Sequence, residues 1–145
     1  MAKWEAKQGD WKHTLYGTDQ GEWLTGYSSD DTIYANGGDD RASGVHGTDI
    51  LDGGDGNDTL DGGTGTDYLT GGLGGDYFIV GANGGWDIVY DYHPDQGDKI
   101  LVQQGGTNDY TVQVTDGDTL IDFGQGDGLV LVGYTGFTSN DLTFY

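Results

Sequence analysis

Acidic side chains recur at every ninth residue through the first half of the chain. The series runs Glu22, Asp31, Asp40, Asp49, Asp58, Asp67 and Asp76. Carboxylate oxygens are ligands for hard cations, and calcium takes about six to eight oxygen ligands from carboxylates and backbone carbonyls together. Pairs of carboxylates also serve glycosidases, but a chain with 25 acidic residues contains such pairs without any catalytic role. The spacing therefore favours a row of cation sites over catalysis.

Glycines surround the last three acids of this series in a fixed pattern. Cut every nine residues from position 53, the sequence reads GGDGNDTLD, GGTGTDYLT and GGLGGDYFI. Glycine adopts positive φ without steric cost, so each unit begins with a tight turn that exposes backbone carbonyls. We therefore expect the metal ligands to be the aspartates at position six from Asp31 to Asp76 and the turn glycines. These glycines are Gly53, Gly54, Gly56, Gly62, Gly63, Gly65, Gly71, Gly72 and Gly74.

The ligand types select among the common metals. Magnesium demands a tighter octahedral geometry than calcium and gives up its water reluctantly. Zinc and copper bind preferentially to histidine and cysteine, but the chain has no cysteine, and His13, His46 and His93 are far apart in the sequence. We therefore expect several calcium ions.

The nine-residue unit extends upstream without a gap, so that seven units cover residues 17–79. Each unit combines a six-residue turn with a three-residue strand, and the strand points one apolar side chain inward and its two neighbours outward. Two units form one coil with strands on opposite walls. The repeat predicts an all-β fold, a parallel β-roll of about three and a half coils. The inward residues are Leu24, Ile33, Ala42, Leu51, Leu60, Leu69 and Phe78.

Stacking of the coils brings acids of alternate units together at each edge of the roll. Like charges repel, and one inward apolar side chain per unit is too small a core to offset the ordering of so many glycines. We therefore expect ions between stacked turns to be necessary for folding. The expected pairs of acids are Glu22/Asp40, Asp31/Asp49, Asp40/Asp58, Asp49/Asp67 and Asp58/Asp76.

Composition excludes several classes of protein. The chain has 145 residues, which suits one domain, and its net charge of −20 excludes nucleic-acid binding and disfavours an anionic membrane surface. It has no run of 18 apolar residues that could span a membrane. The first residues, MAKWEAKQGDW, lack the apolar stretch of a secretory signal peptide. Three explanations stay open: the protein remains inside the cell, export is directed by another segment, or Met1 is not the natural start.

The second half of the chain abandons the nine-residue rule. Its strand-like runs are WDIVYDY, DKILVQQ, DYTVQVT, TLIDF, GLVLVGY and LTFY, and VTDGDTLIDF predicts a hairpin. A solenoid needs its open end covered. We therefore divide the chain into an N-terminal flank (1–16), the repeats (17–79) and a C-terminal β cap (80–145). We interpret Asp87, Asp91, Asp95 and Asp98 as solvated turn acids rather than as a further ion site.

These units resemble the nonapeptide of RTX (repeats-in-toxin) proteins, the hemolysin-type calcium-binding repeat. GGDYFIV and DIVYDYHPDQGDKILV are similar to the region that follows such repeats in secreted bacterial proteins. The resemblance implies a calcium-bound, right-handed parallel β-roll, type I secretion, and folding when the chain meets extracellular calcium. The final SNDLTFY resembles the tail of type I secretion signals, although short apolar C-termini are common. The leading interpretation is a monomeric calcium-responsive domain of a larger secreted protein, with that protein's N-terminal domain as a partner.

Two other functions stay open. Trp23, Tyr68 and Tyr77 occupy outward positions and could stack on sugar rings, as in a module that binds an alginate-like polysaccharide, although packing on the flanks or on a neighbouring domain is the simpler interpretation. An adhesin or ice-binding repeat would need a regular threonine array, and positions three and five supply only Thr48, Thr64 and Thr66. We expect no enzymatic activity, because no nucleophile arrangement is recognisable.

Overall fold

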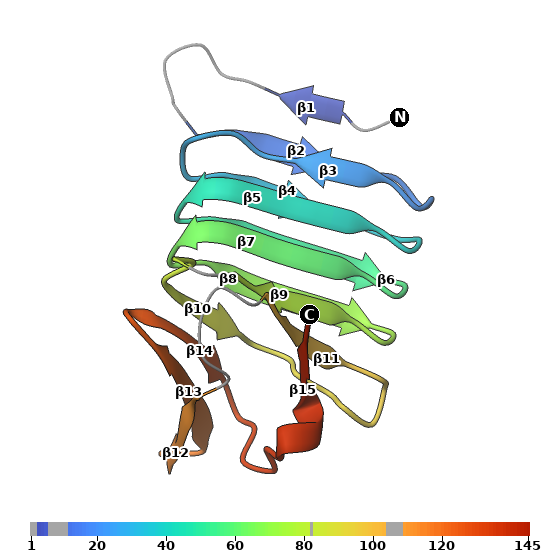
Figure 1. Cartoon of the computed structure of the whole chain (residues 1–145). Helices are drawn as coiled ribbons and strands as arrows, with labels where there is room; N and C mark the ends of the chain where they lie inside the picture. The colour runs from blue at the N-terminus through green and yellow to red at the C-terminus, as the bar shows by residue number, and fades with distance from the viewer. Residues whose placement is uncertain (1–2, 6–11, 82, 104–108) are drawn as a thin grey trace.

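The computed structural model describes residues 3–5, 12–81, 83–103 and 109–145. Through the repeats and the two strands that follow them, successive strands alternate between two sheets that face each other (Figure 1). One sheet has the order β1-β2-β4-β6-β8-β10-β14-β13-β12 and the other β15-β11-β9-β7-β5-β3. The strands are β1 (Lys3–Glu5), β2 (Thr14–Tyr16), β3 (Trp23–Thr25), β4 (Thr32–Tyr34), β5 (Arg41–Gly47), β6 (Ile50–Asp55), β7 (Thr59–Gly65), β8 (Tyr68–Leu73), β9 (Tyr77–Val80), β10 (Trp86–Val89), β11 (Lys99–Val102), β12 (Thr111–Thr115), β13 (Asp118–Gly124), β14 (Asp127–Leu131) and β15 (Leu142–Phe144).

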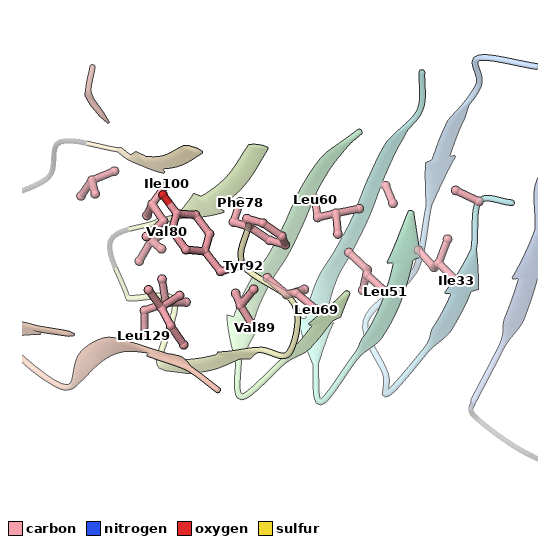
Figure 2. Close-up of a cluster of buried hydrophobic side chains, with 14 of the residues drawn as sticks. Ile33, Leu51, Leu60, Leu69, Phe78, Val80, Val89, Tyr92, Ile100 and Leu129 are labelled. Atoms are coloured by element: carbon pink, nitrogen blue, oxygen red, sulfur yellow. The ribbon is translucent and has the colours of Figure 1, made fainter. Parts of the chain in front are cut away.

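The nine-residue period is confirmed as half a coil. Leu51 pairs in register with Leu69 across β6 and β8, and Leu60 pairs with Phe78 across β7 and β9, so that each residue lies beside its equivalent two units later. All four side chains are fully buried. They form a narrow file of single apolar side chains between the two sheets (Figure 2). The parallel β-roll with two units per coil is therefore confirmed.

The turns use the backbone conformations that the glycine pattern predicts. Positions two and four of each unit from residue 35 onward have positive φ, as in Gly54 (+97°) and Gly56 (+141°). The coils also stack so closely that a Cβ at Gly54 would overlap the carbonyl oxygen of Asn36 in the preceding coil. Asn36 and Val45 are the non-glycine residues at position two with positive φ. Glycine is thus required both for the turn and for the stacking.

The roll is longer than the seven units predict, so the expected three and a half coils are wrong. β10 pairs in parallel with β8 and β14, and β11 pairs in parallel with β9 and β15. Each sheet therefore contains six parallel strands, which form about five turns.

The strands after the repeats keep the parallel pairing but not the spacing. A strict period would pair Leu69 with Asp87, whereas its partner is Val89. In the same way, the partner of Phe78 is Ile100, which lies later in the chain than the period predicts. The coils continue while the loops lengthen, and this is why the sequence period ends early.

The predicted hairpin is confirmed as β12 and β13, which are antiparallel and joined at Asp116 and Gly117, both with positive φ. β13 continues into β14, which joins the roll. A short 3₁₀ helix, η1 (Ser139–Asp141), precedes β15. Its Asp141 accepts a hydrogen bond from the buried Tyr92 hydroxyl at 3.2 Å. No helix in the described part of the chain is long and apolar enough to cross a membrane.

Candidate metal centre

The position-six aspartates lie inside the molecule rather than in solvated turns. Each stands two residues before an inward apolar side chain, so the strand that begins there carries the carboxylate into the interior. Their side chains face along the inner edge of the roll, and none is more than 3% exposed. These residues are Asp31, Asp40, Asp49, Asp58, Asp67 and Asp76.

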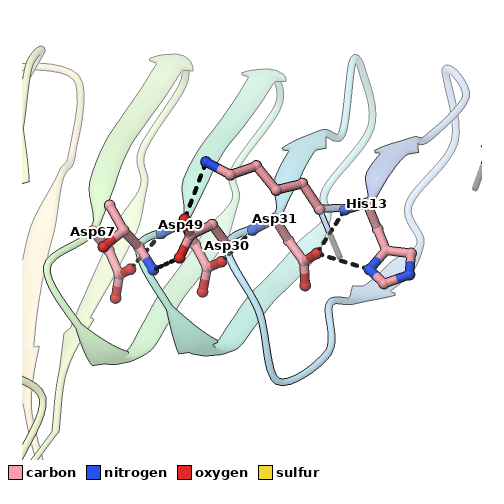
Figure 3. Close-up of polar contacts among 7 residues, drawn as sticks. His13, Asp30, Asp31, Asp49 and Asp67 are labelled. Atoms are coloured by element: carbon pink, nitrogen blue, oxygen red, sulfur yellow. Dashed lines mark hydrogen bonds and ion pairs between the residues drawn. The ribbon is translucent and has the colours of Figure 1, made fainter. Parts of the chain in front are cut away.

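The acids form two files, one at each edge of the roll. In each step, the backbone N–H of one acidic residue donates to Oδ1 of the equivalent aspartate two units later. The structure thus brings together all five pairs that the sequence predicts. One file joins Glu22 to Asp40 (2.6 Å), Asp40 to Asp58 (2.7 Å) and Asp58 to Asp76 (2.8 Å). The other joins Asp31 to Asp49 (2.6 Å) and Asp49 to Asp67 (2.8 Å), as Figure 3 shows.

The second carboxylate oxygen carries the strongest sign of a missing partner. Within the described residues, Oδ2 is buried and has no hydrogen-bond partner in five of the aspartates, namely Asp40, Asp49, Asp58, Asp67 and Asp76. A buried carboxylate oxygen without a partner is costly, and native structures rarely tolerate a repeated set of them. Each file therefore presents a series of oxygens that only a ligand would satisfy.

The glycine at position one provides space for these oxygens. A Cβ at Gly44 would overlap Oδ2 of Asp49 and would lie 2.6 Å from the carbonyl oxygen of Gly62. The same arrangement surrounds Gly53, where Oδ2 of Asp58 and the carbonyl oxygen of Gly71 meet. Carboxylate and carbonyl oxygens together are the donor set of calcium. The donor atoms present therefore fit a calcium ion by their chemistry.

Side chains alone do not complete such a site. Across the described residues, no group of three or more histidine, aspartate or glutamate side chains gathers closely enough to hold a metal. A cation here would need the turn carbonyls as further ligands. The expected source of these carbonyls is the glycine turns, such as those that neighbour Asp58.

Burial makes the ionised form of these acids unfavourable. Desolvation raises the pKa of Asp49 to about 7 and the pKa values of Asp58 and Asp76 to about 6, with the neighbouring carboxylates of each file adding to the increase. Burial also raises the pKa values of Asp40 and Asp67. Near neutral pH, the files therefore combine buried negative charge with mutual repulsion, which a divalent cation would relieve.

The N-terminal end of one file is satisfied by protein groups. Oδ1 of Asp31 accepts the backbone N–H of His13 (3.0 Å) and lies 3.1 Å from its Nδ1, while Oδ2 accepts the N–H of Tyr27 (2.6 Å). Asp31 was expected among the metal ligands with the other aspartates. Its carboxylate differs from theirs because both oxygens already have partners.

Sequence reasoning missed two members of the files. Asp87 accepts the N–H of Asp67 (3.1 Å), and Asp98 accepts the N–H of Asp76 (2.9 Å). Both side chains are buried, so their interpretation as solvated turn acids is wrong. Burial raises the pKa of Asp87 to about 8. A local sequence pattern could have identified both residues, because an acid stands two residues before an inward apolar residue in each case. The two examples are Asp87 with Val89 and Asp98 with Ile100, and this pattern persists after the nine-residue period ends.

The other two acids of that group have different positions. Asp91 accepts the backbone N–H groups of Gly71 and Gly72, both at 2.8 Å, and so joins the loop after β10 to the preceding coil. Asp95 is exposed, as a solvated turn acid should be.

The three outward aromatic residues do not share one surface. Trp23 on β3 and Tyr77 on β9 lie on the same sheet, with 85% and 41% of their surfaces exposed. Tyr68 belongs to β8 in the opposite sheet and stacks on Tyr90, with ring centroids 6.2 Å apart. The structure therefore separates Tyr68 from the other two candidates for ligand binding.

Comparison with solved structures places the architecture among known β-rolls. The extracellular lipase LipA from Serratia marcescens matches with a TM-score of 0.50 at 14% identity, over 97% of this chain and 41% of the lipase. A subunit of the mannuronan C5-epimerase from Azotobacter vinelandii is 25% identical, over 88% of this chain and 80% of that one, with a TM-score of 0.38. The likeness to the lipase supports the fold alone.

Sequence comparison identifies the repeats themselves. No curated protein sequence matches the chain. The family model of the RTX calcium-binding nonapeptide repeat, which spans four copies of the unit, matches residues 16–50 and again residues 43–78. These matches cover the files from Glu22 to Asp76 and the glycine turns around them. Residues 16–78 of this chain therefore match the RTX calcium-binding nonapeptide repeat.

Proposed function

We propose that this chain is a calcium-responsive folding domain of a larger secreted protein, in which ions between stacked turns hold the coils together. The observation that carries the proposal is the set of five buried Oδ2 atoms without partners among the described residues. Asp40, Asp49, Asp58, Asp67 and Asp76 would supply these oxygens, and the carbonyls of the glycine turns would complete the shell. When bound, calcium supplies positive charge and links neighbouring turns.

The residues of the chain explain why folding would depend on the ion. The Oδ1 atoms fix the stacking of the coils through hydrogen bonds to backbone N–H groups, as between Asp58 and Asp76. This arrangement buries a line of carboxylates, which costs free energy. The narrow file of apolar side chains in Figure 2 buries too little apolar surface to offset that cost. Since the acids can be exposed and hydrated when the chain is unfolded, metal binding and folding would be coupled.

The C-terminal half would complete the roll in this proposal. Residues 80–145 add the last coils and the β12–β13 hairpin, so we assign them the role of a cap on the repeats at 17–79, with residues 1–16 as an N-terminal flank. The last residues pair with β11 as β15. A secretion signal in SNDLTFY would then be accessible before this strand pairs, that is, before calcium folds the chain.

An extracellular setting agrees with the type of site. Calcium modules of extracellular proteins work at calcium concentrations of roughly 0.1–1 mM, and a chain that folds only at such concentrations would stay unfolded inside a cell. The proposed role is structural rather than catalytic. The parent protein's N-terminal domain and calcium are its expected partners, and we expect the chain to be monomeric.

Circular dichroism across a calcium titration tests this proposal. The purified chain should show little β structure in chelator and should gain it cooperatively as calcium is added. Asp58→Ala and Asp67→Ala should weaken this response, whereas Asp109→Ala, which changes an exposed acid outside the files, should not. A β-sheet spectrum that excess chelator leaves unchanged would overturn the proposal.

A carbohydrate-binding module is the second candidate function. The observation that favours it is the exposed Trp23 on the same sheet as Tyr77. The adhesin or ice-binding alternative receives no comparable support, because Thr48, Thr64 and Thr66 occupy two turns on one edge and do not extend into a longer array.

A further inference from the structure

β12 is an edge strand whose outer side has no strand beside it among the described residues. It forms one end of the first sheet and pairs with β13 alone (Figure 1). All five of its residues, Thr111–Thr115, are exposed. A strand of an antiparallel sheet commonly packs one of its faces on the core. β12 therefore presents both its side chains and its free edge to another molecule.

The other edge strands of the two sheets are shorter. β1, β3 and β15 have three residues each, whereas β12 has five. Natural edge strands avoid pairing with other chains by being short, by a β-bulge, or by carrying lysine or proline. β12 has none of these features, because its sequence TVQVT contains no charge and no proline and its register with β13 is continuous. Its valines and threonines also favour β structure. The strand is thus suited to pairing with a further strand.

The hairpin places the free backbone groups of this edge at two valines. β12 and β13 are joined by the two-residue turn of Asp116 and Gly117. In such a hairpin, the residues on either side of the turn bond to each other, and every second pair after them does the same. Counting back from Thr115, the N–H and C=O groups of Val112 and Val114 point away from β13 and toward the free edge.

The same two valines form an apolar side of the edge. Val112 pairs with Ile121 and Val114 pairs with Thr119, and both partners are fully buried. Residues paired across two strands share one face of the sheet, yet 38% of Val112 and 55% of Val114 is exposed. The other three residues of β12 form its polar side. A strand added at this edge would cover the valines with apolar side chains of its own.

Acidic residues stand at both ends of this uncharged edge. Asp109 precedes β12 and Asp116 follows it, and both are exposed. Neither forms an ion pair with a base in the part of the chain that the structure describes. The net charge of −20 repels an acidic partner and attracts one with basic groups at both ends. Two copies of β12 paired in antiparallel fashion would bring like charges together, so a second copy of this chain is disfavoured.

We propose that the β12 edge binds an extended segment of another protein as an antiparallel tenth strand of the first sheet. The segment alternates apolar and polar residues over the length of β12 and carries a lysine or arginine at each end. Its backbone pairs with Val112 and Val114, its apolar side chains cover the same valines, and its bases lie beside Asp109 and Asp116. The antiparallel direction continues the pairing of β12, β13 and β14 and is the more stable one.

Fluorescence anisotropy of a labelled peptide with the full chain in calcium tests the inference. The probe is Lys-Thr-Val-Thr-Val-Thr-Lys with blocked termini, and we expect it to bind with an affinity that falls as salt is added. One control peptide has glutamate in place of both lysines. The other keeps every side chain but carries an N-methyl group on each valine, which removes the backbone donors that face β12. Both controls should bind at least roughly tenfold more weakly.

Substitutions in β12 test the same backbone contacts from the side of the chain. Val112→Pro/Val114→Pro removes both donors at the free edge. It leaves the pairing with β13 in place, because proline is tolerated where the N–H faces away from the neighbouring strand. This variant should bind the probe at least roughly tenfold more weakly. If it loses β structure by circular dichroism, the N-methylated peptide decides the question with the unchanged chain.

A second pair of substitutions tests the charges. Asp109→Asn/Asp116→Asn should weaken binding of the probe roughly threefold at low salt and should reduce its salt dependence. The matched control is Asp19→Asn/Asp55→Asn, which changes the net charge equally at two exposed acids of the repeats. It should bind within about twofold of the unchanged chain. Equal weakening in the two variants would show that net charge, and not the ends of β12, attracts the probe.

Other outcomes would also overturn the inference. Full affinity in Val112→Pro/Val114→Pro, or of the N-methylated peptide, would show that no strand is added at β12. Equal binding of the glutamate peptide would show that the ends do not select a basic partner. A chain that sediments as a dimer, and as a monomer after Val112→Pro/Val114→Pro, would make a second copy the occupant. A folded chain that ignores the probe contradicts this inference alone, whereas a chain that stays unfolded in calcium contradicts the proposed function and, with it, the β12 edge.

Discussion

The backbone N–H of Asp58 donates to Oδ1 of Asp76 at 2.8 Å, while Oδ2 of Asp76 is buried without a partner among the described residues. One oxygen of the carboxylate therefore holds two coils in register, and the other remains for a cation. Because both oxygens belong to one side chain, stacking the coils and creating the calcium sites are the same event. This relationship links the coils that contain Asp40 to Asp76 to metal binding.

Replacing Asp58 with asparagine separates the two roles. An asparagine oxygen can still accept the N–H of Asp40, and its amide group can donate toward the carbonyl of Gly71, which borders the same space. Since the buried charge disappears, Asp58→Asn should increase β structure in chelator. It should also raise the calcium concentration at the folding midpoint by at least roughly tenfold, because a metal ligand is lost. Circular dichroism measures both effects. Asp109→Asn is the control, and a parallel response in the two variants would contradict the assignment of Asp58.

Acidic pH should stabilise the metal-free roll. The folded-state pKa values of Asp49 (about 7), Asp58 and Asp76 (about 6) lie above the unfolded value of about 3.9. The folded chain therefore binds more protons, so this contribution to stability is fully present below about pH 4 and is lost as pH rises through about 6 to 7. In metal-depleted buffer, the β structure measured by circular dichroism should be greater at pH 4.5 than at pH 7.5.

Calcium should reverse this order, since protons and calcium compete for the same carboxylates. The gain of β structure on addition of calcium, measured by circular dichroism, should be larger at pH 7.5 than at pH 4.5. A calcium effect that is independent of pH would show that the buried carboxylates are not the ligands.

Two glycines with the same φ distinguish turn conformation from stacking. Gly54 has φ +97° and faces the carbonyl of Asn36, whereas Gly126 has φ +99° and no atom within 4 Å of a built Cβ. Gly126→Ala should cost about 1 kcal/mol from the backbone conformation alone. Gly54→Ala should cost about 1–3 kcal/mol more, because the coils must separate. Urea unfolding in saturating calcium measures the difference, and equal losses would mean that the stacking is looser than the structure shows.

Val45 marks a position where the sequence departs from its own pattern. It occupies position two with φ +85°, a conformation that a β-branched side chain rarely adopts. Relief of this strain should exceed the entropic cost of glycine, so Val45→Gly should stabilise the calcium-bound chain by about 1 kcal/mol. Asn36→Gly is the matched control at φ +75°. Asparagine tolerates positive φ and its Nδ2 donates to the carbonyl of Gly17, so this change should be neutral or slightly destabilising. Thermal unfolding compares the two variants.

The period of nine fixes most of the repeat region, because each element of the coil corresponds to a position in the unit. It predicts that Leu60 lies over Phe78 and that Asp58 lies over Asp76, and both relationships are present. It also implies that Tyr68 and Tyr77, in consecutive units, lie on opposite walls. The hydrogen-bond state of Oδ2 in Asp58 could not be predicted, since it depends on side-chain orientation rather than on spacing.

Beyond residue 79, the period fails although the architecture continues. Loops of variable length connect the later strands, so Leu131 pairs with Val89 even though β11 and the β12–β13 hairpin lie between them in the sequence. Parallel pairing depends on backbone register and on inward apolar residues, and neither requires equal spacing. What persists is the local triplet of an acid, an outward residue and an inward apolar residue. This triplet identifies Asp98 and Ile100 as part of the roll.

Asp98 provides a test of this extension of the files. Its Oδ1 accepts the N–H of Asp76 at 2.9 Å, its Oδ2 accepts the N–H of His93 at 2.7 Å, and the residue is 2% exposed. Asp98→Ala leaves two N–H groups without acceptors at the end of one file, so it should destabilise the calcium-bound chain by about 2–3 kcal/mol. Asp95→Ala, earlier in the same loop and exposed, should change stability by less than about 0.5 kcal/mol. Urea unfolding in saturating calcium compares the two. Small effects of both substitutions would mean that Asp98 is a solvated turn acid and that the file ends at Asp76. A large effect of Asp98→Ala alone would show that the coils after the repeats are held by the same carboxylate-to-backbone bonds.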